Sequence, residues 1–247
     1  MLLREIIGIT TAARNCIRNY VDRLRNSFEK CKQPNGLYRV LLLIEVAKKL
    51  SGQDLFQGEH RLKLPVILGI DWGNINRGLF NVHGEWDYEI VLNIARMMKV
   101  KKMDDIWWAT EIDYGAIRST LVHEYVHFLQ RYTKSSHCVN PFRTKKDYMN
   151  RGHEQGAWAA GEAELIRHQL EPFNQQGENL APYILSALRH RGFSDEFLRR
   201  LKTENPVAWK QVMKKAAQIA MKDMDKDDKL PWQNDKQLPE IALSSIG

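Results

Sequence analysis

Cysteine is scarce in this chain of 247 residues, which contains Cys16, Cys31 and Cys138 and no C-x-x-C pair. An odd, scattered set argues against a disulfide scaffold and fits a reducing compartment. No apolar run reaches the length of a membrane span, so we expect no transmembrane segment. The apolar first nine residues are interrupted by Arg4 and Glu5 and do not form a convincing signal peptide. These absences predict a cytoplasmic or virion-associated protein with no membrane partner.

The chain also lacks internal repeats and a complete calcium loop. The acidic run 223–228 begins like such a loop, but its sixth position is not glycine and its twelfth, Asn234, is not glutamate. We therefore expect a solvated segment there. Residues 223–247 are polar, contain Pro231 and Pro239, and are predicted to be an extended tail.

The chain has a formal net charge of +7, with lysine and arginine spread along its length. Such a charge can attract nucleic acid or acidic proteins. No nucleic-acid motif accompanies it, so the sequence favours a basic, solvated surface, with nucleic acid as a less favoured partner. The oligomeric state cannot be read from these residues.

Periodicity divides the chain into a helical start, a short sheet region and a helical end. Apolar residues repeat with a helical period over 13–28, and a second helix is predicted over 37–50, after the break at 34–36. Strands are predicted over 62–70, 78–82, 85–93 and 106–109, and a later helix starts at Asn205-Pro206. The pattern predicts an α+β fold with a helical region 1–52, a main domain 53–222 and the tail 223–247.

The most informative segment is Leu121–Phe128, in which His123, Glu124 and His127 form an H-E-x-x-H motif. Histidines four residues apart lie on one helix face, so their ring nitrogens can converge on one metal ion. The glutamate points to the side, where it can reach a metal-bound water. The alternative interpretation is a pair of core histidines satisfied by hydrogen bonds.

A second helix is predicted to start near Gly152, with Glu154 in its first turn. Small residues at 157 and 161 allow its face to approach another helix closely. Glu154 is therefore well placed to serve as a third metal ligand. The alternative interpretation is an acidic residue that favours the helix dipole.

These two segments resemble the gluzincin branch of the zincin metallopeptidases over about residues 62 to 170. That resemblance implies a small sheet packed on the H-E-x-x-H helix and one Zn²⁺ held by His123, His127 and Glu154. It also implies an edge strand that binds the substrate backbone, for which the segment 85–93 is a candidate. The alternative interpretation of 85–93, equally favoured, is a plain sheet strand. His153 and Glu162 remain alternatives to Glu154, and a three-histidine site would resemble the SprT-type zincins.

The resemblance implies a zinc peptidase that acts on a protein or peptide substrate, with Glu124 as the general base. Tyr148, Tyr183 and His190 are candidates for a donor to the developing oxyanion, whereas His168 lies too far along the helix from Glu154. No further cofactor is predicted. One alternative is a catalytically silent, metal-stabilised structural or binding component of a larger assembly such as a viral particle. The other is a protease acting on DNA-bound protein. The intact Glu124 favours an enzyme.

Overall fold

The computed structural model describes residues 11–56, 63–74, 76–83, 87–132, 152–174, 183–184, 186–187, 190 and 196–224. The chain divides into two compact units, one of residues 8–129 and one of residues 130–247 together with 1–7. The boundary falls in the last turn of α3 (Tyr114–Tyr132). We describe each unit separately.

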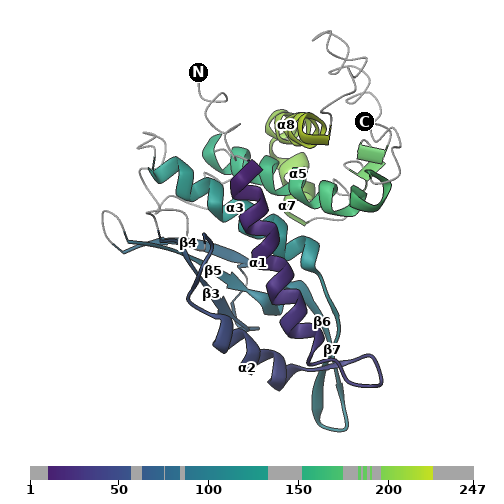
Figure 1. Cartoon of the computed structure of the whole chain (residues 1–247). Coiled ribbons are helices and arrows are strands. Elements are labelled where there is room, and N and C mark those ends of the chain that lie inside the picture. Colours follow the sequence, from purple (N-terminus) through teal and green to yellow (C-terminus); the bar gives the residue numbers. More distant parts are fainter. Residues whose placement is uncertain are drawn as a thin grey trace. The chain divides into compact units, whose positions relative to one another are not determined.

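The first unit begins with two helices, α1 (Thr11–Glu29) and α2 (Val40–Leu50), which Figure 1 shows in purple. The helical period predicted over 13–28 is confirmed, because its six apolar positions are all buried: Ala13, Ile17, Tyr20, Val21, Leu24 and Phe28. The second predicted helix starts later than expected. Residues 38–39 form the short strand β1 (Tyr38–Arg39) instead.

A four-stranded mixed sheet has the order β2-β3-β5-β4, with β3 and β5 parallel and the other pairs antiparallel. Its strands are β2 (Gln53–Asp54), β3 (Pro65–Gly69), β4 (Gly78–Val82) and β5 (Tyr88–Asn93). The 3-10 turn η2 (Ile94–Met97) follows β5. The prediction of 78–82 matches β4. Because β5 lies between β3 and β4, the prediction that 85–93 serves as an edge strand is wrong, and β4 is the edge beside β5.

A second, antiparallel sheet has the order β1-β7-β6, with β6 (Met98–Met103) and β7 (Ile106–Ile112) forming a hairpin. The two residues of its turn, Asp104 and Asp105, have positive φ angles of 48° and 62°. Both central residues of a type I′ hairpin turn take this conformation, which Asp tolerates. Strand β6 was not predicted, because lysines fill its exposed positions and lower its apparent strand propensity.

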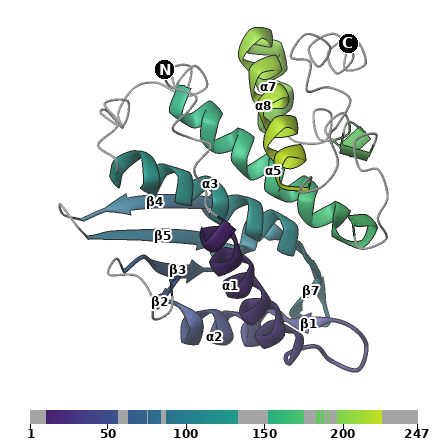
Figure 2. The ribbon, with the colours of Figure 1, turned by 45° about the horizontal axis from the view of Figure 1, so that its top comes forward.

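Aromatic packing joins α3 to the four-stranded sheet. Phe128 of α3 lies 5.5 Å from Tyr88 and 6.2 Å from Phe80, measured between ring centroids. On the same helix Tyr125 stacks on Phe128 at 5.6 Å and meets Phe56 at 5.6 Å. Figure 2 shows the strands side by side, with β4 nearest to α3. The expectation that a small sheet packs on the H-E-x-x-H helix is therefore confirmed.

The second unit contains α5 (Gly152–Asn174), α7 (Glu196–Glu204) and α8 (Pro206–Met224). Its core is an apolar cluster in which Ala159, Ala163 and Ile166 of α5 pack with Trp209, Val212 and Ala216 of α8. The predicted helix starts at Gly152 and Pro206 are confirmed, and Asn205 caps α8 by accepting a hydrogen bond from the Ala208 amide. Helix α7 was not predicted.

The fold class is thus α+β, with six α-helices and two small sheets among the described residues. No helix in the described ranges combines the length and hydropathy of a membrane span. Almost all of the predicted tail 223–247 lies outside the described residues.

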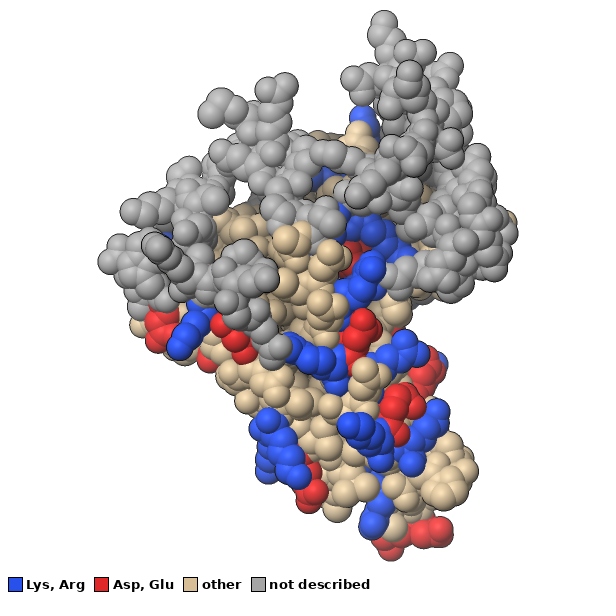
Figure 3. Space-filling view, in the orientation of Figure 1, with Lys and Arg blue, Asp and Glu red and all other residues tan. Residues whose placement is uncertain are grey.

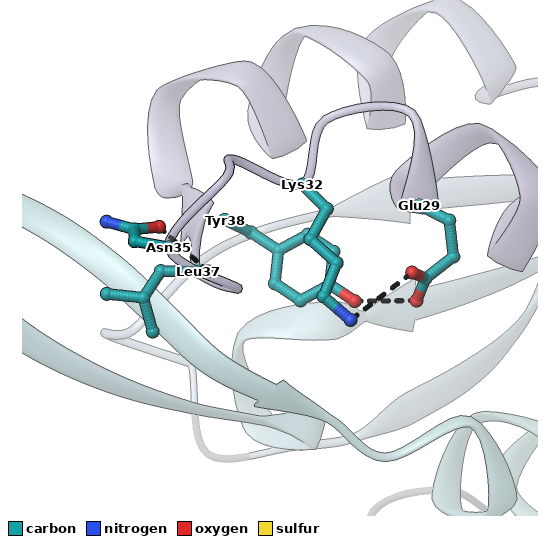
Figure 4. A network of polar contacts seen from close by, with 5 residues as sticks. All are labelled: Glu29, Lys32, Asn35, Leu37 and Tyr38. Carbon is teal, nitrogen blue, oxygen red and sulfur yellow. Dashed lines mark hydrogen bonds and ion pairs between the residues drawn. The ribbon is translucent and has the colours of Figure 1, made fainter.

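A polar network holds the turn between α1 and β1 (Figure 4). The Tyr38 hydroxyl donates to Glu29 Oε1 at 2.6 Å, and Lys32 pairs with the same carboxylate at 3.6 Å. The Asn35 side chain accepts from the Leu37 amide at 3.0 Å. Burial and the bond to Glu29 raise the pKa of Tyr38 to about 12. This network fixes the start of β1 and, after it, the first turn of α2.

We expect the protein to lose stability as the pH rises from 10 to 12. The pKa of Tyr38 and that of Tyr125 are raised to about 12 in the folded protein, from about 10 in an unfolded chain. The two tyrosines contribute fully to the free energy of unfolding below pH 10. This contribution is lost as the pH rises through their pKa in the folded protein. The free energy of unfolding, measured with urea at pH 8, 10 and 11, should therefore fall less with pH for Tyr38→Phe than for wild type.

The exposed Tyr183 provides the matched control, because 41% of its surface is accessible. Tyr183→Phe should leave the alkaline fall as it is in wild type. An equal fall in wild type and Tyr38→Phe would contradict the assignment of this pH dependence to Tyr38.

Candidate metal centre

Helix α3 presents three faces with different partners. Tyr125 and Phe128 pack on the sheet, as described above. The second face carries His123 and His127, and the third carries Thr120 and Glu124. These positions follow from helical geometry: each residue turns the helix by about 100°, which places Glu124 between the two histidines and the aromatic pair.

The two histidines converge as the motif predicts. Nε2 of His127 lies 3.1 Å from Nε2 of His123, with the ring planes at 80° and the ring centroids 4.8 Å apart. Two nitrogens bound to one tetrahedral zinc at the usual bond length would lie about 3.3 Å apart. The same separation also suits a hydrogen bond between two neutral imidazoles. The pair alone therefore fits both a metal site and a satisfied pair.

The third residue of the group comes from the first turn of α5. His123, His127 and Glu154 each offer one ligand atom, and these atoms all lie within 4.8 Å of one another. Two of the three residues are buried, with exposed fractions of 8% for His123 and 7% for Glu154. This group could hold a metal ion, and its two nitrogens and one carboxylate oxygen are a donor set that suits zinc.

The rival ligands are placed differently. Glu162 is buried, but it belongs to no group of potential metal ligands among the described residues. Glu164 forms a buried ion pair with Arg167 at 2.8 Å and is likewise absent from that group. The side chain of His153 lies outside what the structure describes.

Glu124 lies beside the first residue of the edge strand β4. A Cβ built on Gly78 would lie 2.8 Å from Glu124 Oε1 and 2.5 Å from Thr120 Cγ2, closer than such atoms can pack. The backbone of β4 therefore lies directly against this face of α3, and a side chain at position 78 would require Thr120 or Glu124 to shift. Sequence reasoning missed Gly78, although a glycine at a strand start is a known sign of close backbone approach.

The candidate oxyanion donors remain predictions. Tyr148 lies outside the described residues, while Tyr183 and His190 are both exposed. His168 is half-buried in α5 and has an interaction partner. Comparisons with protein-family models, with curated proteins and with solved structures give no match to this chain. The function of this chain is therefore inferred from its own residues.

Gly78→Ala should destabilise the protein by about 1–3 kcal/mol, because the added methyl group overpacks the contact with Thr120 and Glu124. Thr120→Ser in the same chain removes the closest atom, Cγ2, and should restore part of the loss. The free energy of unfolding of the two variants, measured with urea, tests this.

Gly69→Ala in β3 is a matched control, because its Cβ would meet nothing closer than the Leu92 carbonyl oxygen at 3.9 Å. We expect a change below about 0.5 kcal/mol there. Equal costs at positions 69 and 78, or no recovery with Thr120→Ser, would show that the close approach of β4 to α3 is not present in solution.

Proposed function

We propose that this protein is a zinc-dependent metallopeptidase with one zinc ion bound by His123, His127 and Glu154. The observation that carries the proposal is the group of two imidazole nitrogens and one carboxylate oxygen within 4.8 Å of one another. Glu124 next to the first ligand supports catalysis as well as metal binding, because a purely structural site needs no base there.

Burial supports a cation at this group. A carboxylate that is 7% exposed keeps its charge in a low-dielectric environment only with strong compensation. Two neutral imidazoles supply lone pairs rather than positive charge. A divalent ion would bind one nitrogen of each ring and one carboxylate oxygen at once, whereas a hydrogen bond between the histidines involves the two rings alone.

A zinc ion held by His123, His127 and Glu154 would supply an acidified water and would polarise the scissile carbonyl. Glu124 accepts the water proton on a carboxylate oxygen and later delivers it to the leaving amine. His123 and His127 keep their Nε2 atoms available as ligands and therefore act as neutral imidazoles. The close contact at Gly78 holds the Glu124 carboxylate beside β4.

The edge strand supports a peptide as the substrate. β4 pairs with β5 on one side and has no partner strand on the other among the described residues. Its exposed positions include Leu79 at 49% and Val82 at 43%, and it carries none of the lysines or prolines that usually protect an edge. An extended peptide that adds to this edge would place its backbone next to Glu124.

Protein substrates in general are favoured over DNA-bound protein. On the face that Figure 3 shows, basic and acidic side chains of the described residues lie interspersed, without a continuous basic surface. Among the described residues several charges are paired, for example Lys99 with Glu111 at 2.6 Å and Lys102 with Asp105 at 2.7 Å. A mixed surface gives little of the long-range attraction that nucleic-acid binding requires.

Glu124→Gln should keep zinc and lose hydrolysis, whereas Glu154→Ala should lose zinc. Removal of a general base lowers the rate by about 10²–10⁴-fold. Zinc content by mass spectrometry after desalting and cleavage of fluorescent casein are the two measurements. Chelation with 1,10-phenanthroline should stop cleavage by wild type, and zinc should restore it.

Glu111→Gln is the matched control, since Glu111 is an exposed glutamate in β7 paired with Lys99. It should keep both zinc and activity. Full hydrolysis by Glu124→Gln would refute the mechanism, and full zinc content in Glu154→Ala would refute the ligand assignment. A wild type that needs zinc for stability and cleaves nothing would support a metal-stabilised binding protein instead.

A further inference from the structure

A cavity lies within residues 8–129 and shares no residue with the metal group. It has a volume of about 530 Å³, and its walls come from α2, β6, β7 and the loop after β3. Its lining includes Arg39, Leu41, Ile44, Trp72, Val100 and Trp107. Volumes between roughly 300 and 1,000 Å³ with apolar and aromatic walls are typical of small-molecule sites.

The walls include apolar side chains that remain open to solvent. The exposed fractions are 66% for Leu41, 41% for Trp72 and 51% for Trp107. Large apolar residues exposed singly need no explanation, but three that line one cavity indicate a binding surface. A ligand that covers these three side chains would bury much of their exposed apolar surface, which favours binding.

The loop that presents Trp72 is held by hydrogen bonds to its backbone. Arg96 donates to the Trp72 carbonyl and to the Asn74 carbonyl, each at 2.7 Å. The buried Asn93 donates to the Asp71 carbonyl at 2.8 Å and accepts from the Asp71 amide at 3.0 Å. The backbone that carries Trp72 is therefore held in place without a ligand, which lowers the entropic cost of ordering this loop on binding.

The charge at the cavity is positive. Of its two charged lining residues, Asp105 is already paired with Lys102 at 2.7 Å. The guanidinium of Arg39 makes no ion pair within the part of the chain that the structure describes. Arg39 also stands at the N-cap of α2, whose first turn has neither an acidic residue nor a side-chain cap. The positive end of that helix adds to the charge of Arg39.

We propose that this cavity binds a small anionic amphiphile, a molecule with an aromatic or aliphatic body and a single acid group. The body lies against Trp72, Trp107 and Leu41, and the acid group pairs with Arg39. The volume suits one small molecule, and the surplus positive charge selects an acid over a neutral or basic compound. This site is independent of the metal group, so it stands or falls separately from the peptidase proposal.

Two fluorescent probes that differ in one group test the proposal: 1-anilinonaphthalene-8-sulfonate and its uncharged counterpart N-phenyl-1-naphthylamine. Arg39→Gln should weaken binding of the sulfonate about tenfold or more and leave the neutral probe within about twofold. Arg39→Lys should retain much of the sulfonate affinity. Leu41→Ser should weaken both probes, and added salt should weaken only the sulfonate.

Val207→Ser is the control, because Val207 is an equally exposed apolar residue, at 67%, in α8. It should change neither affinity, and circular dichroism should show every variant folded. The proposal fails if the sulfonate does not bind saturably to wild type or if Arg39→Gln affects both probes alike. It also fails if Val207→Ser weakens binding as much as Leu41→Ser does.

Discussion

The approach of the two imidazole nitrogens in α3, 3.1 Å apart, is the interaction on which the proposed chemistry depends. It follows from the four-residue spacing of the histidines on one helix, and the rotation of α3 about its axis determines which neighbours the pair faces. Tyr125 and Phe128 pack in an aromatic cluster on the sheet, and this contact directs the histidine face elsewhere. A modest rotation of the helix would bury the imidazoles against apolar side chains, where they would lack polar partners. The hydrophobic packing of Tyr125 and Phe128 thus determines which surroundings the His123 and His127 side chains face.

The same rotation places Glu124 on the face that meets β4. The helix therefore carries two of the candidate ligands on one side and the proposed proton acceptor on the next, and β4 is the edge of the sheet beside that proposed acceptor. The polar functions are assigned to different faces of one rigid element, which keeps their relative positions fixed. The second cavity uses other elements, the start of α2 and the β6–β7 hairpin, so the two sites do not compete for residues.

The candidate ligands could be predicted because their signal is local. His123 and His127 are related by helical spacing alone, and Glu154 follows from a helix start at Gly152. The order of the strands could not be predicted, since pairing β5 with β3 and β4 depends on contacts far apart in sequence. β6 was missed for another reason: its lysines follow from its place at a sheet edge, which single-residue propensities do not record. Trp72 and Trp107 likewise look like core residues until the fold brings them to one cavity.

Gly78 has a mechanical consequence. With hydrogen in place of a side chain, nothing compressible separates the outermost strand from the carboxylate that is proposed to take the proton. When another chain hydrogen-bonds along that strand and displaces it, we expect the Glu124 side chain to move with it. Binding of a peptide along β4 and the position of the Glu124 carboxylate are therefore expected to change together.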